Sequence, residues 1–178
     1  MTVKGGQRPN QIGVALFVKD AAAMAEFYKS VLNATEVRCH AMAEDGLFPK
    51  GAVTAVELQI GSLCLTVAVE NPRWKEAPRS DWPRSPESAE TTTVFLSLYV
   101  DDVDAVVARA LALGATTLNP QKPIEDAHWG DRVAQFIDPA GHAWRIQTAK
   151  EEVAFEELPH RLELARAARS RSAGAQPT

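Results

Sequence analysis

The stretches IGVALFVKDAAAMAEFYKSVLNATEV (residues 12–37) and VFLSLYVDDVDAVVARALALGATTL (residues 94–118) follow one pattern. Each begins with an apolar run rich in β-branched and aromatic residues, which predicts a strand. The aspartate that follows, Asp20 or Asp102, is typical of a helix N-cap because its carboxylate accepts from exposed N–H groups of the first turn. The helix should end at Asn33 or Gly114, since both residues tolerate left-handed backbone. The chain is therefore expected to contain an internal duplication.

Each copy continues into three further predicted strands. They cover about 35–42, 53–60 and 63–69 in the first copy, and about 115–119, 131–137 and 142–148 in the second. Turn sequences stand in matching places before the last strand, Ile60-Gly61-Ser62 in one copy and Asp138-Pro139-Ala140-Gly141 in the other. The sequence predicts an α+β protein made of two tandem βαβββ modules.

This pattern divides the chain into five parts. They are an N-terminal arm (1–11), module one (12–70), a Pro-rich linker (71–92), module two (93–148) and a tail (149–178) with a helix from about Glu156 to Ser170 and a frayed end. The linker has no periodicity, so we expect it to wrap on the surface or over the mouth of a cavity. Its tryptophans are interpreted as packing anchors or, alternatively, as ligand contacts.

Composition limits the classes of function. Hydrophobic residues make up 46% of the 178 residues and charged residues 24%, as in ordinary globular domains. The net charge of −4 argues against general binding of nucleic acid, and the apolar runs are too short to span a membrane. The polar start MTVKGGQRPNQ shows no secretory signal, so we expect a cytoplasmic protein. There Cys39 and Cys64 should be reduced, buried thiols rather than a disulfide.

The duplicated pattern resembles the glyoxalase/bleomycin-resistance/dioxygenase superfamily, the vicinal oxygen chelate fold. The matching pieces are LFVKDAAAMAEFYKSVLNATEV, VELQIGSLCL, LYVDDVDAVVARALALGAT and HWGDRVAQFIDPAGHAW, and with the tail segment EEVAFEELPHR they look closest to the PhnB-like branch. The resemblance implies two four-stranded sheets whose concave faces form a cup, with helices on the outside. It also implies that a homodimer is plausible.

Metal-dependent members of that superfamily hold a divalent ion with four side chains, and the resemblance gives their positions here. Seven residues before each capping aspartate stand Gly13 and Phe95, and the last strands carry Arg145 and either Leu65 or Thr66. These side chains cannot supply the nitrogen and carboxylate ligands that a catalytic ion needs. We therefore expect no metal at the family position and no cofactor.

The metal positions also indicate which strand residues face the cup. The predicted ligand-binding set is Phe17, Glu57, Phe95, Ser97, Tyr99, Arg145 and Gln147, with Trp129 and Arg132 at the entrance by analogy with the branch. Arg145 suits a carboxylate or phosphate, and Glu57 is the candidate catalytic base. Alternatively, Arg145 and Glu57 form a structural ion pair, Trp129 anchors its loop, and Arg132 pairs with Asp131 or solvent.

These features leave three functions open. The first is a metal-free binding protein of the bleomycin-resistance kind, whose partner is a small aromatic or anionic molecule. The second is a glyoxalase-like isomerase or lyase, or a dioxygenase, which depends on a metal if the aligned ligand positions are shifted. The third is an interaction domain with a filled cup.

Overall fold

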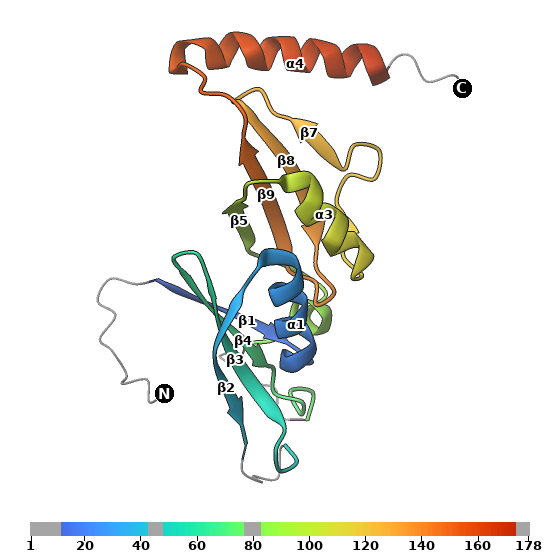
Figure 1. Cartoon of the computed structure of the whole chain (residues 1–178). Coiled ribbons are helices and arrows are strands. Elements are labelled where there is room, and N and C mark those ends of the chain that lie inside the picture. The colour runs from blue at the N-terminus through green and yellow to red at the C-terminus, as the bar shows by residue number, and fades with distance from the viewer. Residues whose placement is uncertain (1–11, 43–47, 77–82, 174–178) are drawn as a thin grey trace.

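The computed structural model describes residues 12–42, 48–76 and 83–173, so the predicted arm at 1–11 lies outside the described residues. The first module contains β1 (Gly13–Val18), α1 (Ala21–Leu32), β2 (Thr35–Ala41), β3 (Val53–Ile60) and β4 (Leu63–Val69). The second contains β5 (Phe95–Tyr99), α3 (Val103–Ala112), β6 (Thr116–Thr117), β7 (Ile124–Asp126), β8 (Asp131–Ile137) and β9 (Ala143–Ala149). The α+β fold class and the repeated βαβββ order are confirmed (Figure 1).

The two sheets have equivalent topologies. The first runs β1-β4-β3-β2 and the second β5-β9-β8-β6, with β7 paired to β8 as an addition. In each module the first strand pairs in parallel with the last, and the remaining neighbours are antiparallel. The last strand therefore occupies the middle of each sheet, where both of its edges are hydrogen-bonded.

Both helices begin and end at the residues that the pattern predicts. The Asp20 carboxylate accepts from Ala23 N at 2.9 Å, and that of Asp102 accepts from Ala105 N at 3.0 Å. Asn33 takes a φ of 54° and Gly114 a φ of 96°, the left-handed conformation that ends a helix. The repeat is thus visible in its capping groups as well as in its strands.

Each helix covers one face of its own sheet. In β3 the residues Val56, Leu58 and Ile60 are buried, while Glu57 and Gln59 on the opposite face are half-buried. The same alternation buries Phe136 and Ile146 in the second sheet. Helices α1 and α3 contact each other (Figure 1), and the Arg109 guanidinium donates to Val31 O at 3.1 Å. The core is therefore continuous across the two modules.

Several segments differ from their predicted bounds. A short helix, α2 (Pro86–Ala89), interrupts the linker, and β7 was not expected. The tail begins with a 3-10 turn, η1 (Phe155–Glu157), followed by α4 (Leu158–Ala173). Cys39 is exposed and Cys64 half-buried, so the prediction that both thiols are buried is wrong. Cys39 lies on β2, the outermost strand of its sheet, where α1 gives little cover.

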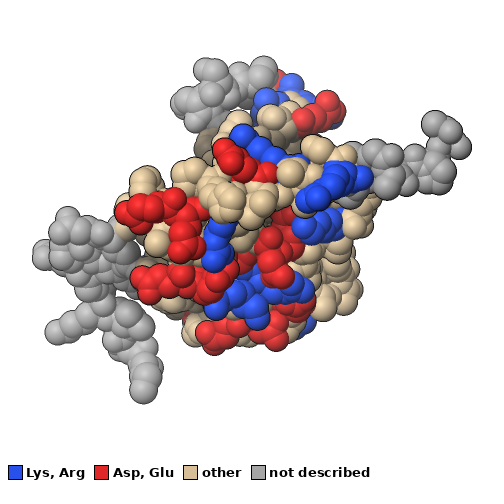
Figure 2. Space-filling view, turned by 90° about the horizontal axis from the view of Figure 1, so that it is seen from above, with Lys and Arg blue, Asp and Glu red and all other residues tan. Residues whose placement is uncertain are grey.

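Helix α4 crosses the far end of the second module (Figure 1). Figure 2 looks down on that end and shows acidic and basic side chains interspersed. Arg161 of α4, for example, pairs with Glu151 and Glu157. Among the described residues, no helix combines the length and apolar character needed to cross a membrane.

Candidate ligand-binding face

The face of the second sheet opposite α3 is exposed along β5, and we call it the open face. It carries Phe95, Ser97 and Tyr99 from β5, Ala143, Arg145 and Gln147 from β9, and Asp131, Val133 and Gln135 from β8. Tyr99 is 61% exposed and Phe95 is 47% exposed, so the described part of the chain leaves these aromatic residues accessible. Large apolar rings beside a few polar groups are typical of ligand-binding surfaces.

Arg145 stands in the middle of this face. It lies opposite Ser97 on one side and Gln135 on the other. The Gln135 amide satisfies its hydrogen bonds when its oxygen faces the guanidinium. That oxygen then accepts from Arg145 Nε at 3.2 Å and from Nη2 at 3.1 Å. The guanidinium carbon lies 5.5 Å from the centre of the Phe95 ring, within cation–π range. One edge of the guanidinium is thus held by the protein, and Nη1 has no hydrogen bond within the described residues.

A carboxylate holds two of the aromatic side chains in place. Asp131 is only 6% exposed, and its Oδ2 accepts from the Tyr99 hydroxyl and from Trp129 Nε1, both at 2.8 Å. This hydrogen bond, with some desolvation, raises the pKa of Tyr99, so the phenol is neutral at ordinary pH. The site predicted from the sequence does not include Asp131 or Gln135. Alternation along β8 could have identified both residues, because they share a face with Val133.

The turn before β8 requires a glycine. Gly130 has a φ of 98°, and a Cβ there would lie 2.4 Å from Glu151 O. That close approach lets Gly130 O accept from the N–H groups of Lys150 and Glu151. Trp129 and Asp131 are therefore presented by a backbone turn that is itself tied to the end of β9.

Arg132 and Gln147 lie on opposite sides of the second sheet. Gln147 is buried on the open face between Tyr99 and Val133. Arg132 points to the other side, where Nε and Nη2 donate to Asp104 at 2.7 and 2.9 Å and Nη1 donates to Asp126 at 2.9 Å. These bonds lower the pKa of Asp104 and raise that of Arg132. The structure therefore separates Arg132 from the open face.

Glu57 and Phe17 belong to the first sheet. Glu57 Oε1 lies 2.9 Å from His40 Nε2 and 3.7 Å from Arg38 Nη1. Phe17 is half-buried, and its carbonyl oxygen contacts His142 Nε2 at 3.0 Å. Between Glu57 and Arg145, both within the described ranges, the structure records no ion pair. The predicted set is therefore divided between two sheets, and its two charged members have different partners.

The strand register relates the two modules to each other at the positions where the resemblance implies metal ligands. Ala15 lies opposite Thr66, just as Ser97 lies opposite Arg145, so Thr66 is the counterpart of Arg145. Leu65 is fully buried on the helix side. The four positions thus carry Gly13, Thr66, Phe95 and Arg145, a set that does not fit a divalent cation. Elsewhere in the described residues, no three His, Cys, Asp or Glu side chains gather in a metal-binding cluster.

Comparisons with known proteins agree with this architecture. A family model described as a glyoxalase-like domain matches residues 12–147. An uncharacterized protein of Mycobacterium bovis is 32% identical over 143 residues, which cover 80% of this chain and 86% of the relative. An uncharacterized protein of Mycobacterium tuberculosis is also 32% identical, over 80% of this chain and 76% of its own length.

Solved structures show the same fold at low identity. TioX from Micromonospora matches with a TM-score of 0.54 and 19% identity, covering 79% of this chain and 98% of that protein. A glyoxalase/bleomycin resistance protein/dioxygenase family enzyme from Burkholderia phytofirmans matches with a TM-score of 0.54 and 21% identity, covering 77% and 96%. At these identities the likeness establishes the fold alone.

Proposed function

This chain belongs to the glyoxalase-like domain family, within the glyoxalase/bleomycin-resistance/dioxygenase superfamily, and we propose that it binds a small aromatic anion on the open face of its second sheet. The proposal includes the absence of a metal ion at the family's ligand positions. The assignment to the PhnB-like branch stays a prediction.

The position of Arg145 carries this proposal. Its side chain occupies a place where the superfamily resemblance implies a metal ligand, and it is oriented by Gln135 and Phe95. A guanidinium there attracts an anion directly, whereas a metal-dependent relative would use the cation for the same purpose. Charge-assisted hydrogen bonds to a carboxylate or phosphate are stronger than neutral ones, so the anionic group of the ligand should be placed at Nη1.

The aromatic character of the ligand follows from the neighbouring rings. Phe95 and Tyr99 are exposed large aromatic side chains on the same face of β5, with Ser97 between them. Trp129 is linked to Tyr99 through their shared acceptor, Asp131. Ring pairs in offset or edge contact contribute about 0.5–1.5 kcal/mol beyond burial. A flat ring that stacks here would leave its acidic substituent near Arg145.

A second copy of the chain is the proposed cover of this face. The aromatic side chains are too exposed to enclose a ligand by themselves, and superfamily resemblance makes a homodimer plausible. Light scattering after size-exclusion chromatography tests this part of the proposal. If the chain is monomeric at all concentrations tested, a second copy does not cover the binding face.

Calorimetric titration with naphthoate and its neutral amide, naphthamide, tests the binding proposal. We expect the acid to bind more tightly than the amide, and Arg145→Met to abolish that preference. Arg132→Met is the matched control, because Arg132 lies on the helix side of the same sheet and should leave the preference intact. Equal binding of the acid and the amide to the native chain would refute the proposal that the ligand is an anion.

A second candidate is an isomerase or lyase that uses the first sheet. It is favoured by the contact between Glu57 and His40, since a carboxylate beside an imidazole is a common general acid–base pair. If the family's ligand positions are shifted, that enzyme or a dioxygenase depends on a metal. Elemental analysis of protein purified without chelator separates these cases. Stoichiometric zinc, nickel, manganese or iron, lost on Glu57→Gln, would favour the enzyme over the metal-free binding protein.

A further inference from the structure

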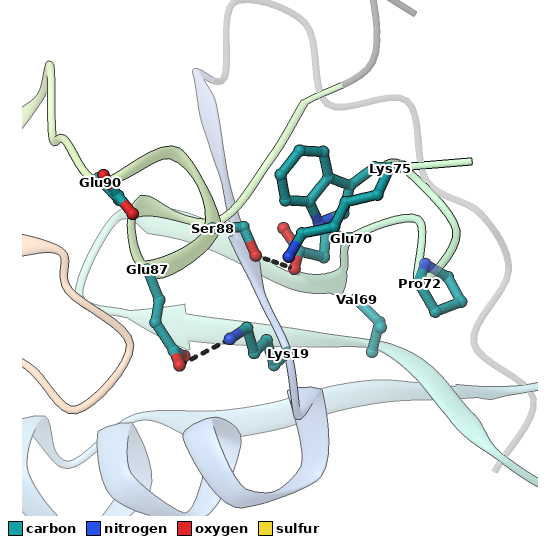
Figure 3. A pocket seen from close by; sticks show the side chains of 9 residues that line it. Lys19, Val69, Glu70, Pro72, Lys75, Glu87, Ser88 and Glu90 are labelled. Atoms are coloured by element: carbon teal, nitrogen blue, oxygen red, sulfur yellow. Dashed lines mark hydrogen bonds and ion pairs between the residues drawn. The ribbon is translucent and has the colours of Figure 1, made fainter. Parts of the chain in front are cut away.

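A pocket lies away from the open face, where the first module meets the linker. It has a volume of about 590 Å³, in the range of small-molecule sites. Figure 3 shows side chains from the end of β1, the end of β4, the start of the linker and α2 converging on it. Those that bear on its chemistry are Lys19, Glu70, Trp74, Lys75, Glu87 and Ser88.

Glu70 is the buried charged group of this pocket. It is only 4% exposed, and its carboxylate accepts from Ser85 N at 2.7 Å and from the Ser88 hydroxyl at 2.5 Å. Both donors are neutral, and the structure records no ion pair to Glu70 within the residues it describes. A buried charge is costly unless an opposite charge accompanies it.

Anchoring the linker does not by itself require this charge. The two hydrogen bonds tie α2 to the end of β4, but a glutamine side chain has one oxygen that could accept at least one of them, and its amide would bury no charge. The negative charge of Glu70 is therefore available for another purpose. Since Glu70 lines an open pocket, an external cation is its natural partner.

The basic side chains at the pocket show where it attracts positive charge. Lys19 Nζ is paired with Glu87 at 2.6 Å (Figure 3), and Lys75 is a second lysine that lines the pocket with Glu70. Lys75 Nζ lies 5.4 Å and the Arg84 guanidinium carbon 4.6 Å from the centre of the Trp74 ring, so this ring already attracts two cations of the chain itself. An ammonium group from a ligand would find the same ring and the same carboxylate.

We propose that this pocket binds a small organic ammonium compound. Glu70 supplies the charge partner, Trp74 the cation–π surface, and Val69 and Pro72 the apolar contact for the body of the ligand. The ligand's ammonium group displaces that of Lys75 from the Trp74 ring. This site is independent of the anion-binding face, whose arginine would repel such a ligand.

Phenethylamine and phenethyl alcohol form a matched pair of probes, because they differ in the charged group. Titration followed by calorimetry should show the amine binding at least about tenfold more tightly, the ratio expected for one charge-assisted contact. Glu70→Gln should remove the difference between the two probes. Equal binding of both probes to the native chain, or a preference that survives in Glu70→Gln, would overturn the proposal.

Lys75→Ala provides a test that does not depend on the folding of the Glu70 variant. Because it removes the competing ammonium, it should tighten phenethylamine binding several-fold and leave phenethyl alcohol unaffected. Unchanged or weaker amine binding would also overturn the proposal. Arg145→Met serves as the control for the open face, and it should not alter amine binding at this pocket.

Discussion

The hydroxyl of Tyr28, on the helix of the first module, donates a hydrogen bond of 2.6 Å to Asp138, in the last turn of the second. Trp144 Nε1 donates to the same carboxylate oxygen at 2.9 Å, and the other oxygen accepts from Ala140 N and His142 N. The aspartate of the Asp-Pro-Ala-Gly turn therefore shapes its own turn and also joins the two modules. All of these groups are buried or nearly so, which makes each bond costly to lose.

Tyr28→Phe should destabilise the protein by about 1–3 kcal/mol, because it leaves the buried Asp138 carboxylate with one donor fewer. Urea unfolding measures the change. Tyr99→Phe is the comparison, since it also removes a donor from a buried carboxylate, Asp131, but from a tyrosine that is mostly exposed and joins no modules. A loss for Tyr28→Phe no larger than that for Tyr99→Phe would show that the bond between the modules contributes little.

The chain should lose stability at alkaline pH. Burial, followed by the charge and hydrogen bond of Asp138, raises the pKa of Tyr28 well above its ordinary value, and the pKa of Tyr99 is raised by Asp131. A raised pKa gives stability that is complete below the unfolded value of about 10 and is lost as pH rises through the folded value.

Ultraviolet absorbance of tyrosinate measures both groups, because the chain has two tyrosines. Asp131→Asn should return the pKa of Tyr99 toward its ordinary value and leave Tyr28 unchanged. A single unshifted titration of both residues in the folded protein would contradict the two hydrogen bonds.

Gly130→Ala should destabilise the protein by more than about 1 kcal/mol, because it combines left-handed backbone with a new Cβ close to Glu151 O. Gly61→Ala is the matched control. Gly61 also has a positive φ, of 54°, but its Cβ would meet nothing within 4 Å. Thermal unfolding of the two variants separates the cost of the left-handed backbone from the cost of the clash with Glu151 O. A similar loss of stability in both variants would contradict the clash.

Asp131→Ala should weaken binding of naphthoate and naphthamide equally, by several-fold, because it releases the aromatic side chains of Tyr99 and Trp129 without touching Arg145. Arg145→Met should instead affect the acid selectively. Calorimetric titration of both variants with both probes compares the two patterns. If Asp131→Ala changed only acid binding, the two aromatic side chains would not form part of the site.

Acid should weaken the bonds between Arg132 and Asp104. The pKa of Asp104 is lowered by the hydrogen bonds from Arg132, so the stability they provide is present above the ordinary pKa of aspartate and is lost as pH falls through the folded value. Asp104 is half exposed, so the effect should stay below about 1 kcal/mol and shrink with salt. Unfolding of Asp104→Asn at neutral and at acid pH measures this contribution. An equal loss of stability at the two pH values would show that it does not come from the ionised Asp104.

The sequence by itself determined the duplicated order of elements, the helix caps and the face that each strand turns to its helix. These features depend on residues that are only a few positions apart, so they can be read from the sequence. Examples are the helix caps Asp20 and Asn33 and the alternation of Val56, Leu58 and Ile60. The resemblance added the expectation, which stays a prediction, that the aligned metal positions lack ligands.

Only the tertiary structure decided which side chains meet. Pairing of Ser97 with Arg145 and of Ala15 with Thr66 identified the counterpart of Arg145, and the separate sheets kept Glu57 away from it. It also brought Asp131 to Tyr99 and Glu70 to Ser88, residues that are far apart or unrelated by any local pattern. These contacts depend on strand register and on packing between distant segments, which hydrophobic periodicity alone does not specify.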